Sequence, residues 1–197
     1  GGLGSTHAIG RVSSLLYGGT QAGVANPDVI LAAVGGVDRL GVNWPTKLWL
    51  RSTAGGTLSP LPTDPEHKYP GGVIRAMAFD PDDWRTVYVV DATNVYRATN
   101  LGPQVKWERI TGNLTPSILS DVVVVADPIS HQDVVVVAGN QGVFRAVAPN
   151  LAASHWVQVG TELPQVFVAD LHYDEVDDLL IAGTNGRGIW TLPNALT

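Results

Sequence analysis

The chain has 197 residues, of which 45% are hydrophobic and 15% charged, and this composition indicates a folded domain rather than a disordered segment. Its net charge of −6 at pH 7, from 12 Lys and Arg residues against 18 Asp and Glu residues, argues against nucleic-acid binding, which requires a basic surface. The lack of Cys excludes disulfides and Cys-ligated metals, and the sequence has no apolar run long enough to predict a membrane span.

A block of 47 residues recurs along the chain. Asp80, Asp127 and Asp174 each follow a short β-like run and are spaced by 47 residues. An earlier copy, around residues 17–19, carries about 15 inserted residues. A repeat of this length predicts one supersecondary unit that is stacked several times.

The first residues are expected to belong to the end of a copy of this repeat rather than to its start. Gly1-Gly2-Leu3 matches the phrase that closes later copies, such as Gly112-Asn113-Leu114. We therefore expect residues 1–10 to be the tail of a preceding copy, and the first whole copy to span about residues 11–62.

The second copy, residues 73–114, shows the unit most clearly. Two apolar runs rich in β-branched side chains, 73–79 and 86–90, are separated by an Asp-Pro-Asp-Asp turn. Residues 95–99 form a third strand, and residues 105–110 alternate apolar and polar side chains as a half-exposed outer strand does. The unit is therefore predicted to be a sheet of four antiparallel strands.

The third copy, residues 119–163, repeats this order, and the fourth, residues 166–193, supplies three strands. No segment has the 3.6-residue period of an amphipathic helix, so almost no helix is expected. The prediction is an all-β protein, a β-propeller array of about four blades over residues 1–197. A β-sandwich would not explain the repeat period. Two alternatives stay open: the blades are the C-terminal part of a larger propeller, completed before residue 1 or by another chain, or they form a self-contained four-bladed ring.

The last blade carries a family resemblance. Residues 170–174 and 180–190 resemble the closing blade of sialidase-like and Asp-box (BNR) repeat propellers. Residues 95–107 and 48–56 resemble Asp-boxes in which Asn100 and Ala54 stand in place of the Asp. The resemblance implies a propeller fold in which the box is structural. It implies no single activity, because such propellers include hydrolases, receptors, assembly factors and binding modules.

Charged residues near the starts of the first strands are candidates to line the central channel. They are Arg11, Arg75, Asp121 and Asp170. By the resemblance, sialidase chemistry would need three Arg residues, a Tyr nucleophile and a neighbouring Glu, and no Tyr–Glu pair is suitably placed. A ring of charge could bind an ion or a polar ligand, and the alternative is that these are ordinary solvated side chains.

Two insertions of the first copy are the best candidates for a binding surface. Residues 37–46 join its second and third strands, residues 63–70 join it to the second copy, and both connections are expected on the same face. Trp44 and Tyr69 are candidate aromatic anchors. The candidate residues in these loops are Asp38, Arg39, Asn43, Trp44, His67, Lys68 and Tyr69. The alternative is that the two loops pack on each other.

No catalytic residue, metal ligand or cofactor site is predicted. The Asp-rich segments 80–83 and 174–178 are typical of turns, and the five His residues lack metal-ligand spacing. We therefore expect a non-catalytic binding or scaffolding propeller, part of a larger protein that is secreted or at a cell surface. Its expected partners are other propeller blades, of the same or another chain, and a protein or glycan ligand. One alternative is a fragment of a carbohydrate-active glycoside hydrolase, and another is a structural subunit that pairs through blade edges.

Overall fold

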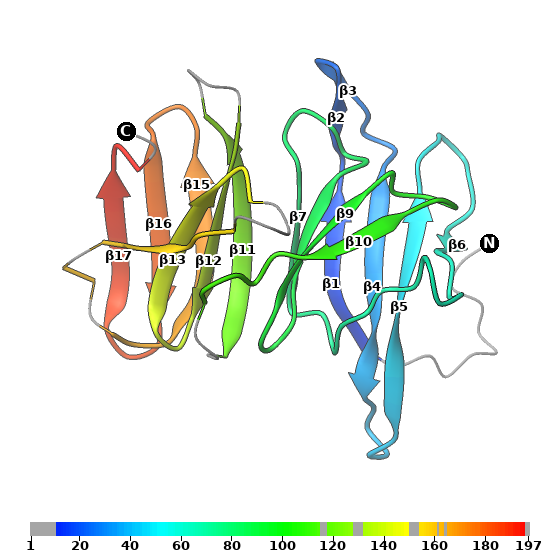
Figure 1. Ribbon diagram of the computed structural model, residues 1–197, viewed down its shortest axis with the longest axis horizontal. Helices are drawn as coiled ribbons and strands as arrows, with labels where there is room; N and C mark the ends of the chain where they lie inside the picture. Colours follow the sequence, from blue (N-terminus) through cyan, green and yellow to red (C-terminus); the bar gives the residue numbers. More distant parts are fainter. Residues whose placement is uncertain are drawn as a thin grey trace.

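The computed structural model describes residues 11–114, 118–127, 132–149, 154–160, 162–163 and 165–195, so the predicted tail at residues 1–10 lies outside the described part. Every regular element in the described part is a β-strand. Within these residues there is thus no helix that could cross a bilayer. Four antiparallel sheets follow one another in chain order (Figure 1).

The strands of each sheet pair in chain order, as in propeller blades, and within the described residues only a small hairpin interrupts this order, between the first two strands of the first sheet. The first sheet consists of β1 (Arg11–Tyr17), β4 (Ile30–Val37), β5 (Asn43–Arg51) and β6 (Ser59–Pro60). The second consists of β7 (Ala76–Phe79), β8 (Val87–Val90), β9 (Val95–Thr99) and β10 (Lys106–Arg109). The third consists of β11 (Leu119–Ala126), β12 (Asp133–Gly139), β13 (Gly142–Val147) and β14 (Val157–Val159). The fourth has β15 (Val168–Asp174), β16 (Leu179–Thr184) and β17 (Gly188–Pro193). The small hairpin, β2 (Thr20–Gln21) and β3 (Val24–Ala25), extends from the first sheet.

The core lies between successive sheets. One cluster of buried side chains, which includes Leu31 and Val89, lies between the first and second sheets. A second, with Tyr88 and Val137, joins the second sheet to the third, and a third, with Val136 and Leu180, joins the third to the fourth. The inner β-branched runs are buried on both faces, which explains their continuous apolar sequence. The predicted all-β, propeller-type architecture is confirmed.

The first strands of the four sheets, β1, β7, β11 and β15, are the innermost strands, because each contacts the first strand of a neighbouring sheet. Three of them share an irregularity close to their first residues. The pairing register shifts at Ser13 in β1, at Ser120 in β11 and at Ala169 in β15, so each of these residues is a bulge. Arg75 stands at the equivalent place just before β7. A bulge re-aims one side chain and reverses the faces of the residues that follow it.

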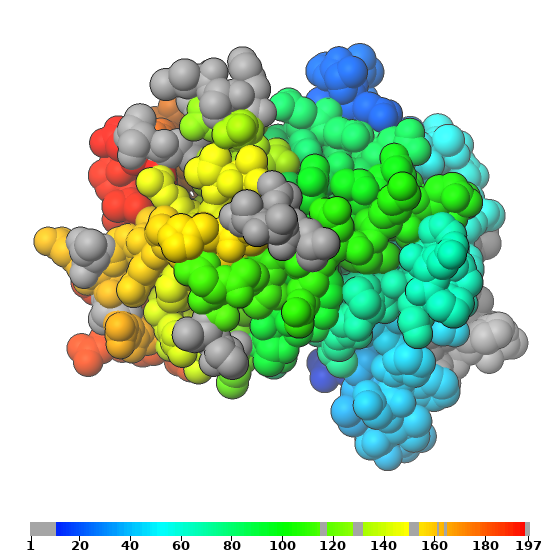
Figure 2. Space-filling model, viewed as in Figure 1, coloured from blue at the N-terminus to red at the C-terminus, as the bar shows by residue number. Residues whose placement is uncertain are grey.

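The two ends of the strands form two different faces of the molecule. We call the side with residues 11, 38–42 and 61–73 the start face, because the innermost strands begin there. We call the side with residues 80–83 and 174–178 the turn face. The predicted Asp turns are confirmed, because Asp80 Oδ1 accepts hydrogen bonds from the backbone of Asp82 (2.8 Å) and Asp83 (3.1 Å). The long β4–β5 hairpin protrudes from the start face (Figures 1 and 2).

Candidate ligand-binding face

A central cavity of about 1100 Å³ opens on the start face, where the innermost strands begin. All four sheets contribute to its lining. The contributing residues include Arg11, Ser13, Arg75, Ser120 and Ala169. Four of these five are the bulge residues or their equivalent, so the bulges determine which side chains face the cavity.

The cavity has an excess of positive charge. Arg11 and Arg75 are exposed, and no hydrogen bond or ion pair joins either guanidinium to another residue of the described part. Asp91 is the acidic residue among the described lining, and it is buried. Its carboxylate accepts three backbone N–H groups, those of Gly72 (2.9 Å), Thr93 (2.8 Å) and Asn94 (2.8 Å). Asp91 is therefore occupied in fixing two backbone segments.

The structure separates the four predicted channel residues. Arg11 and Arg75 line the cavity, whereas Asp121 and Asp170 follow the bulges and are outside its lining. Asp121 Oδ2 accepts the backbone N–H of Leu171 in the next sheet at 2.7 Å. Burial raises the pKa of Asp121, and the negative charge of Asp170 adds to this shift. Asp121 therefore connects two sheets.

A second cleft, of about 510 Å³, lies between the β4–β5 hairpin and residues 61–73. Both insertions contribute to it, and five of the seven candidate loop residues line it. They are Asn43, Trp44, His67, Lys68 and Tyr69. Residues 70–73 also line the central cavity, so one wall separates the two spaces. Thr46 Oγ1 donates to the Gly72 carbonyl (2.9 Å) and helps to fix this wall.

Asp38 supports the cleft from the hairpin. Its Oδ2 accepts Trp44 Nε1–H at 2.8 Å, and its Oδ1 accepts the backbone N–H groups of Leu40 (2.8 Å) and Val42 (2.9 Å). These hydrogen bonds hold the pKa of Asp38 below its usual value, and the bond from Trp44 has the largest effect. The indole is thus held in one orientation. Arg39 is exposed at the hairpin tip and does not line the cleft.

The opposite wall of the cleft is part of the core. Tyr69 makes T-shaped contacts with Tyr96 (5.3 Å between ring centroids) and Trp107 (5.0 Å). Its phenolic oxygen is buried and has no hydrogen-bond partner among the described residues, and burial raises the pKa of Tyr69. Gly71 permits this packing, because a Cβ there would lie 2.3 Å from the phenolic oxygen. Trp107 lines the same cleft and donates its Nε1–H to the His67 carbonyl at 3.0 Å.

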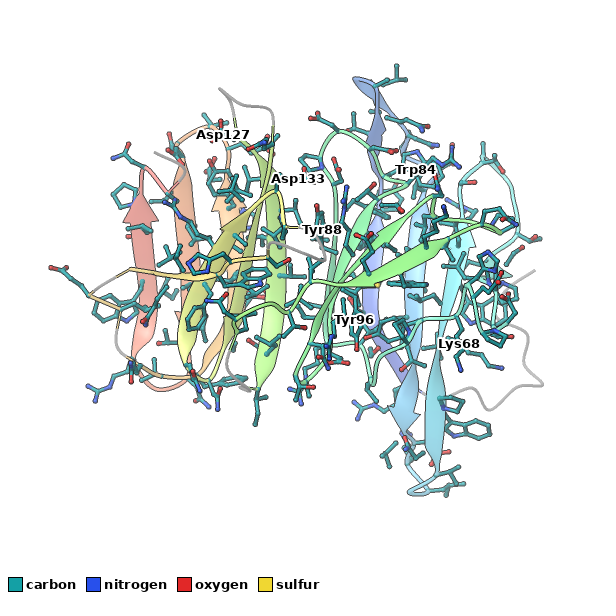
Figure 3. All side chains as sticks on the ribbon, viewed as in Figure 1. Lys68, Trp84, Tyr88, Tyr96, Asp127 and Asp133 are labelled. Carbon is teal, nitrogen blue, oxygen red and sulfur yellow. The ribbon has the colours of Figure 1, made fainter. Side chains whose placement is uncertain are left out.

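The two basic candidates differ in their restraint. His67 Nδ1 lies 2.7 Å from Asp64 Oδ1, and this bond lowers the pKa of Asp64. Lys68 is exposed beside the first sheet, as Figure 3 shows, and it has no ion pair among the described residues. The cleft therefore combines aromatic walls with polar and cationic groups at its edge.

A buried polar cluster on the turn face was not predicted. The hydroxyl of Tyr88 donates to Asp133 Oδ2 at 2.6 Å, and both residues are labelled in Figure 3. Asp80 shares a side-chain hydrogen bond with Asp133. Burial, together with the negative charge of Asp133, raises the pKa of Asp80 to about 6. The cluster joins the second and third sheets. Among the described residues, no group of three or more His, Asp and Glu side chains could hold a metal ion.

Comparison with known proteins supports the fold alone. No family model and no curated protein matches the chain, so membership of the sialidase-like or Asp-box family is not shown. A propeller chain from a structure described as the outer coat vertex of COPII on membranes is similar over 93% of this chain and 47% of its own, with 11% identity and a TM-score of 0.55. A chain of the COPII coat assembled on membranes matches with the same identity and TM-score over 93% of this chain and 26% of its own. A putative 6-phosphogluconolactonase from Bacteroides uniformis matches with 15% identity and a TM-score of 0.49, over 96% of this chain and 69% of its own. The chain thus spans less than half of the two COPII chains.

Proposed function

We propose that the chain is a non-catalytic binding propeller that holds a carbohydrate in the cleft between the β4–β5 hairpin and residues 61–73. The observation that carries this proposal is that both insertions of the first sheet border one cleft of about 510 Å³. Ligand pockets for small molecules have volumes of this order. Loops held by a rigid scaffold are also where binding residues concentrate.

The side chains of the cleft favour a sugar over a purely apolar ligand. Trp44 and Trp107 present flat aromatic surfaces, and Asn43 and Thr46 add groups that form hydrogen bonds. Sugar rings have one apolar face and a rim of hydroxyl groups, so they need both kinds of contact. The bond from Trp44 to Asp38 restricts the indole before binding, which reduces the entropy lost in the complex.

The lining of the cleft favours binding over hydrolysis. Glycoside hydrolysis requires two carboxyl groups about 5–10 Å apart across the sugar. The described residues that line the cleft include no Asp and no Glu. This supports binding rather than hydrolysis of a sugar held in this cleft.

Replacement of Trp44 by Ala should weaken glycan binding about tenfold or more, which corresponds to about 1.4 kcal/mol. The melting temperature should change little, because Trp44 is on a protruding hairpin and outside the buried clusters. A glycan array identifies the ligand, and titration calorimetry with the strongest binder gives the dissociation constants.

Asp82→Asn on the turn face is the matched control for Trp44→Ala and should bind as the unmodified protein does. If Trp44→Ala retains full affinity, the cleft is not the glycan site. If Asp82→Asn loses binding while Trp44→Ala does not, the ligand binds on the turn face. If this protein binds peptides but binds no glycan on the array, the carbohydrate assignment is wrong.

Two variants of Tyr69 distinguish the contribution of its ring packing to stability from that of its hydroxyl group. Tyr69→Phe keeps both aromatic contacts and removes a buried hydroxyl that has no partner, so it should stabilise the fold by about 1 kcal/mol. Tyr69→Ala removes the contacts and should destabilise it by about 3 kcal/mol or more. Urea unfolding of both variants measures the two effects. A clear loss of stability in Tyr69→Phe would mean that the hydroxyl has a partner.

A further inference from the structure

One face of the fourth sheet packs on the third sheet, and the described residues leave the opposite face open. The side chains of Leu171, Leu180 and Ala182 pack toward the third sheet. The alternation of β15, β16 and β17 places another set on the opposite face. This open face includes Asp170, His172, Ile181, Ile189 and Thr191.

The equivalent face of the third sheet is covered by the fourth sheet. Val143 pairs with Ala138 in the third sheet, as Ile189 pairs with Gly183 in the fourth. Both pairs stand at the same place relative to the bulge of the innermost strand. Val143 is 1% exposed and belongs to the core between these sheets, whereas Ile189 is 75% exposed. Ile189 on the open face is thus an apolar residue at the position that the buried Val143 occupies in the interface between the third and fourth sheets.

The carboxylate that bonds across the interface between the third and fourth sheets also has an equivalent on the open face. Asp121, the first paired residue after the bulge in β11, accepts the backbone N–H of Leu171 from the next sheet. Asp170 is the first paired residue after the bulge in β15. It is exposed and forms no hydrogen bond or ion pair within the described part of the chain.

The first sheet has exposed apolar side chains and a backbone position equivalent to Leu171, which are the features that a partner of the open face would need. Leu15 is the second paired residue after the bulge in β1, as Leu171 is in β15. Leu15 and Tyr17 are 60% and 70% exposed, on the face of β1 opposite to Leu16, which packs toward the second sheet. The first and the fourth sheets are the two ends of the array (Figure 1).

We propose that the open face of the fourth sheet packs on the first sheet of a second copy of this chain, with Asp170 accepting the backbone N–H of Leu15 of that copy. The contact continues the interface between the third and fourth sheets. Two copies related by a two-fold axis form the contact twice, which closes a ring of eight sheets. Eight is within the usual range of four to eight propeller blades, and a closed ring leaves no open sheet face.

The first test is the mass of the chain in solution, measured by sedimentation equilibrium. The unmodified chain should be a dimer. Ile189→Ser and Asp170→Ala should each weaken dimerisation about tenfold or more, because they remove a central apolar contact and the repeated hydrogen bond. Both side chains are exposed in the single copy, so far-ultraviolet circular dichroism should be unchanged. Val176→Ser, at a 93% exposed position in the turn of the same sheet, is the matched control and should remain a dimer.

A second test uses the absence of Cys from the chain. The double variant Asp170→Cys, Leu15→Cys should form disulfides between copies and run as a covalent dimer on a non-reducing gel. Asp82→Cys, Leu15→Cys should not. A monomeric unmodified chain overturns the proposal, and so does an open series of larger oligomers. A dimer that is insensitive to Ile189→Ser and Asp170→Ala, or one without the crosslink, also overturns it.

Discussion

Replacement of Trp156 by Ala should destabilise the protein by about 3–5 kcal/mol, which is a loss of roughly 10 °C in melting temperature for a chain of this size. Trp156 is 3% exposed within the core between the second and third sheets. Its Nε1–H donates to the Ile110 carbonyl at 2.9 Å, and its own backbone N–H and carbonyl bond to the side chain of Asn113. The truncation would leave a cavity and a buried carbonyl without a partner. Urea unfolding combined with scanning calorimetry measures the loss.

Trp107→Ala is the matched comparison, because Trp107 stands at the corresponding place of the preceding repeat. Trp107 is only partly buried and lines the cleft, so its removal should cost less stability and should weaken glycan binding. Trp156→Ala should retain binding wherever it remains folded. Equal losses of stability in the two variants would contradict this division between a core tryptophan and a cleft tryptophan.

The repeated sheets could be predicted because their signals are local. Strand and turn residues follow one another within each copy, and Asp80 bonds to residues two and three positions away. The alternation of apolar and polar side chains and the runs of β-branched residues, which predict strands, also extend over only a few residues. The 47-residue period then favoured a propeller over a sandwich, and the all-β architecture agrees with that prediction.

The candidate residues could be predicted only in part. Both insertions lie on the start face, because the direction of each strand follows from the count of strands before it. The bulges were not predicted, since no distinctive residue marks Ser120 or Ala169. Equivalence judged from sequence grouped Asp121 and Asp170 with Arg75, but the shift in register takes both carboxylates out of the lining of the cavity.

Contacts between distant segments account for the rest. Tyr69 was a candidate aromatic anchor, and the sequence did not indicate that its ring packs on Tyr96 and Trp107 from the second sheet. The bond from Tyr88 to Asp133 joins residues 45 positions apart. Neither contact has a local sequence signal, because both arise only when one sheet stacks on the next.

The stability of the protein should fall as the pH rises from about 3.8 to about 6, and Asp80→Asn should remove the largest part of this change. Burial next to Asp133 raises the pKa of Asp80 from 3.8 to about 6. A group whose pKa is higher in the folded state stabilises the fold fully below its unfolded pKa, and this contribution is lost as the pH rises through the folded value. At pH 7.5 the folded protein therefore holds two neighbouring carboxylates between the second and third sheets.

The Asn side chain at position 80 imitates the protonated acid, because its carbonyl oxygen can still accept the turn bonds and its amide can donate to Asp133. Asp80→Asn should raise the melting temperature at pH 7.5 by several degrees and leave it nearly unchanged at pH 3.5. A smaller pH dependence should remain, because the pKa of Asp121 is also raised. Asp82→Asn, at an exposed position of the same turn, is the control for the loss of one negative charge and should have a much smaller effect. Melting curves in buffers of equal ionic strength measure both variants. If Asp80→Asn has a lower melting temperature than the unmodified protein at pH 7.5, the ionised form of Asp80 stabilises the fold and our assignment of the pair is wrong.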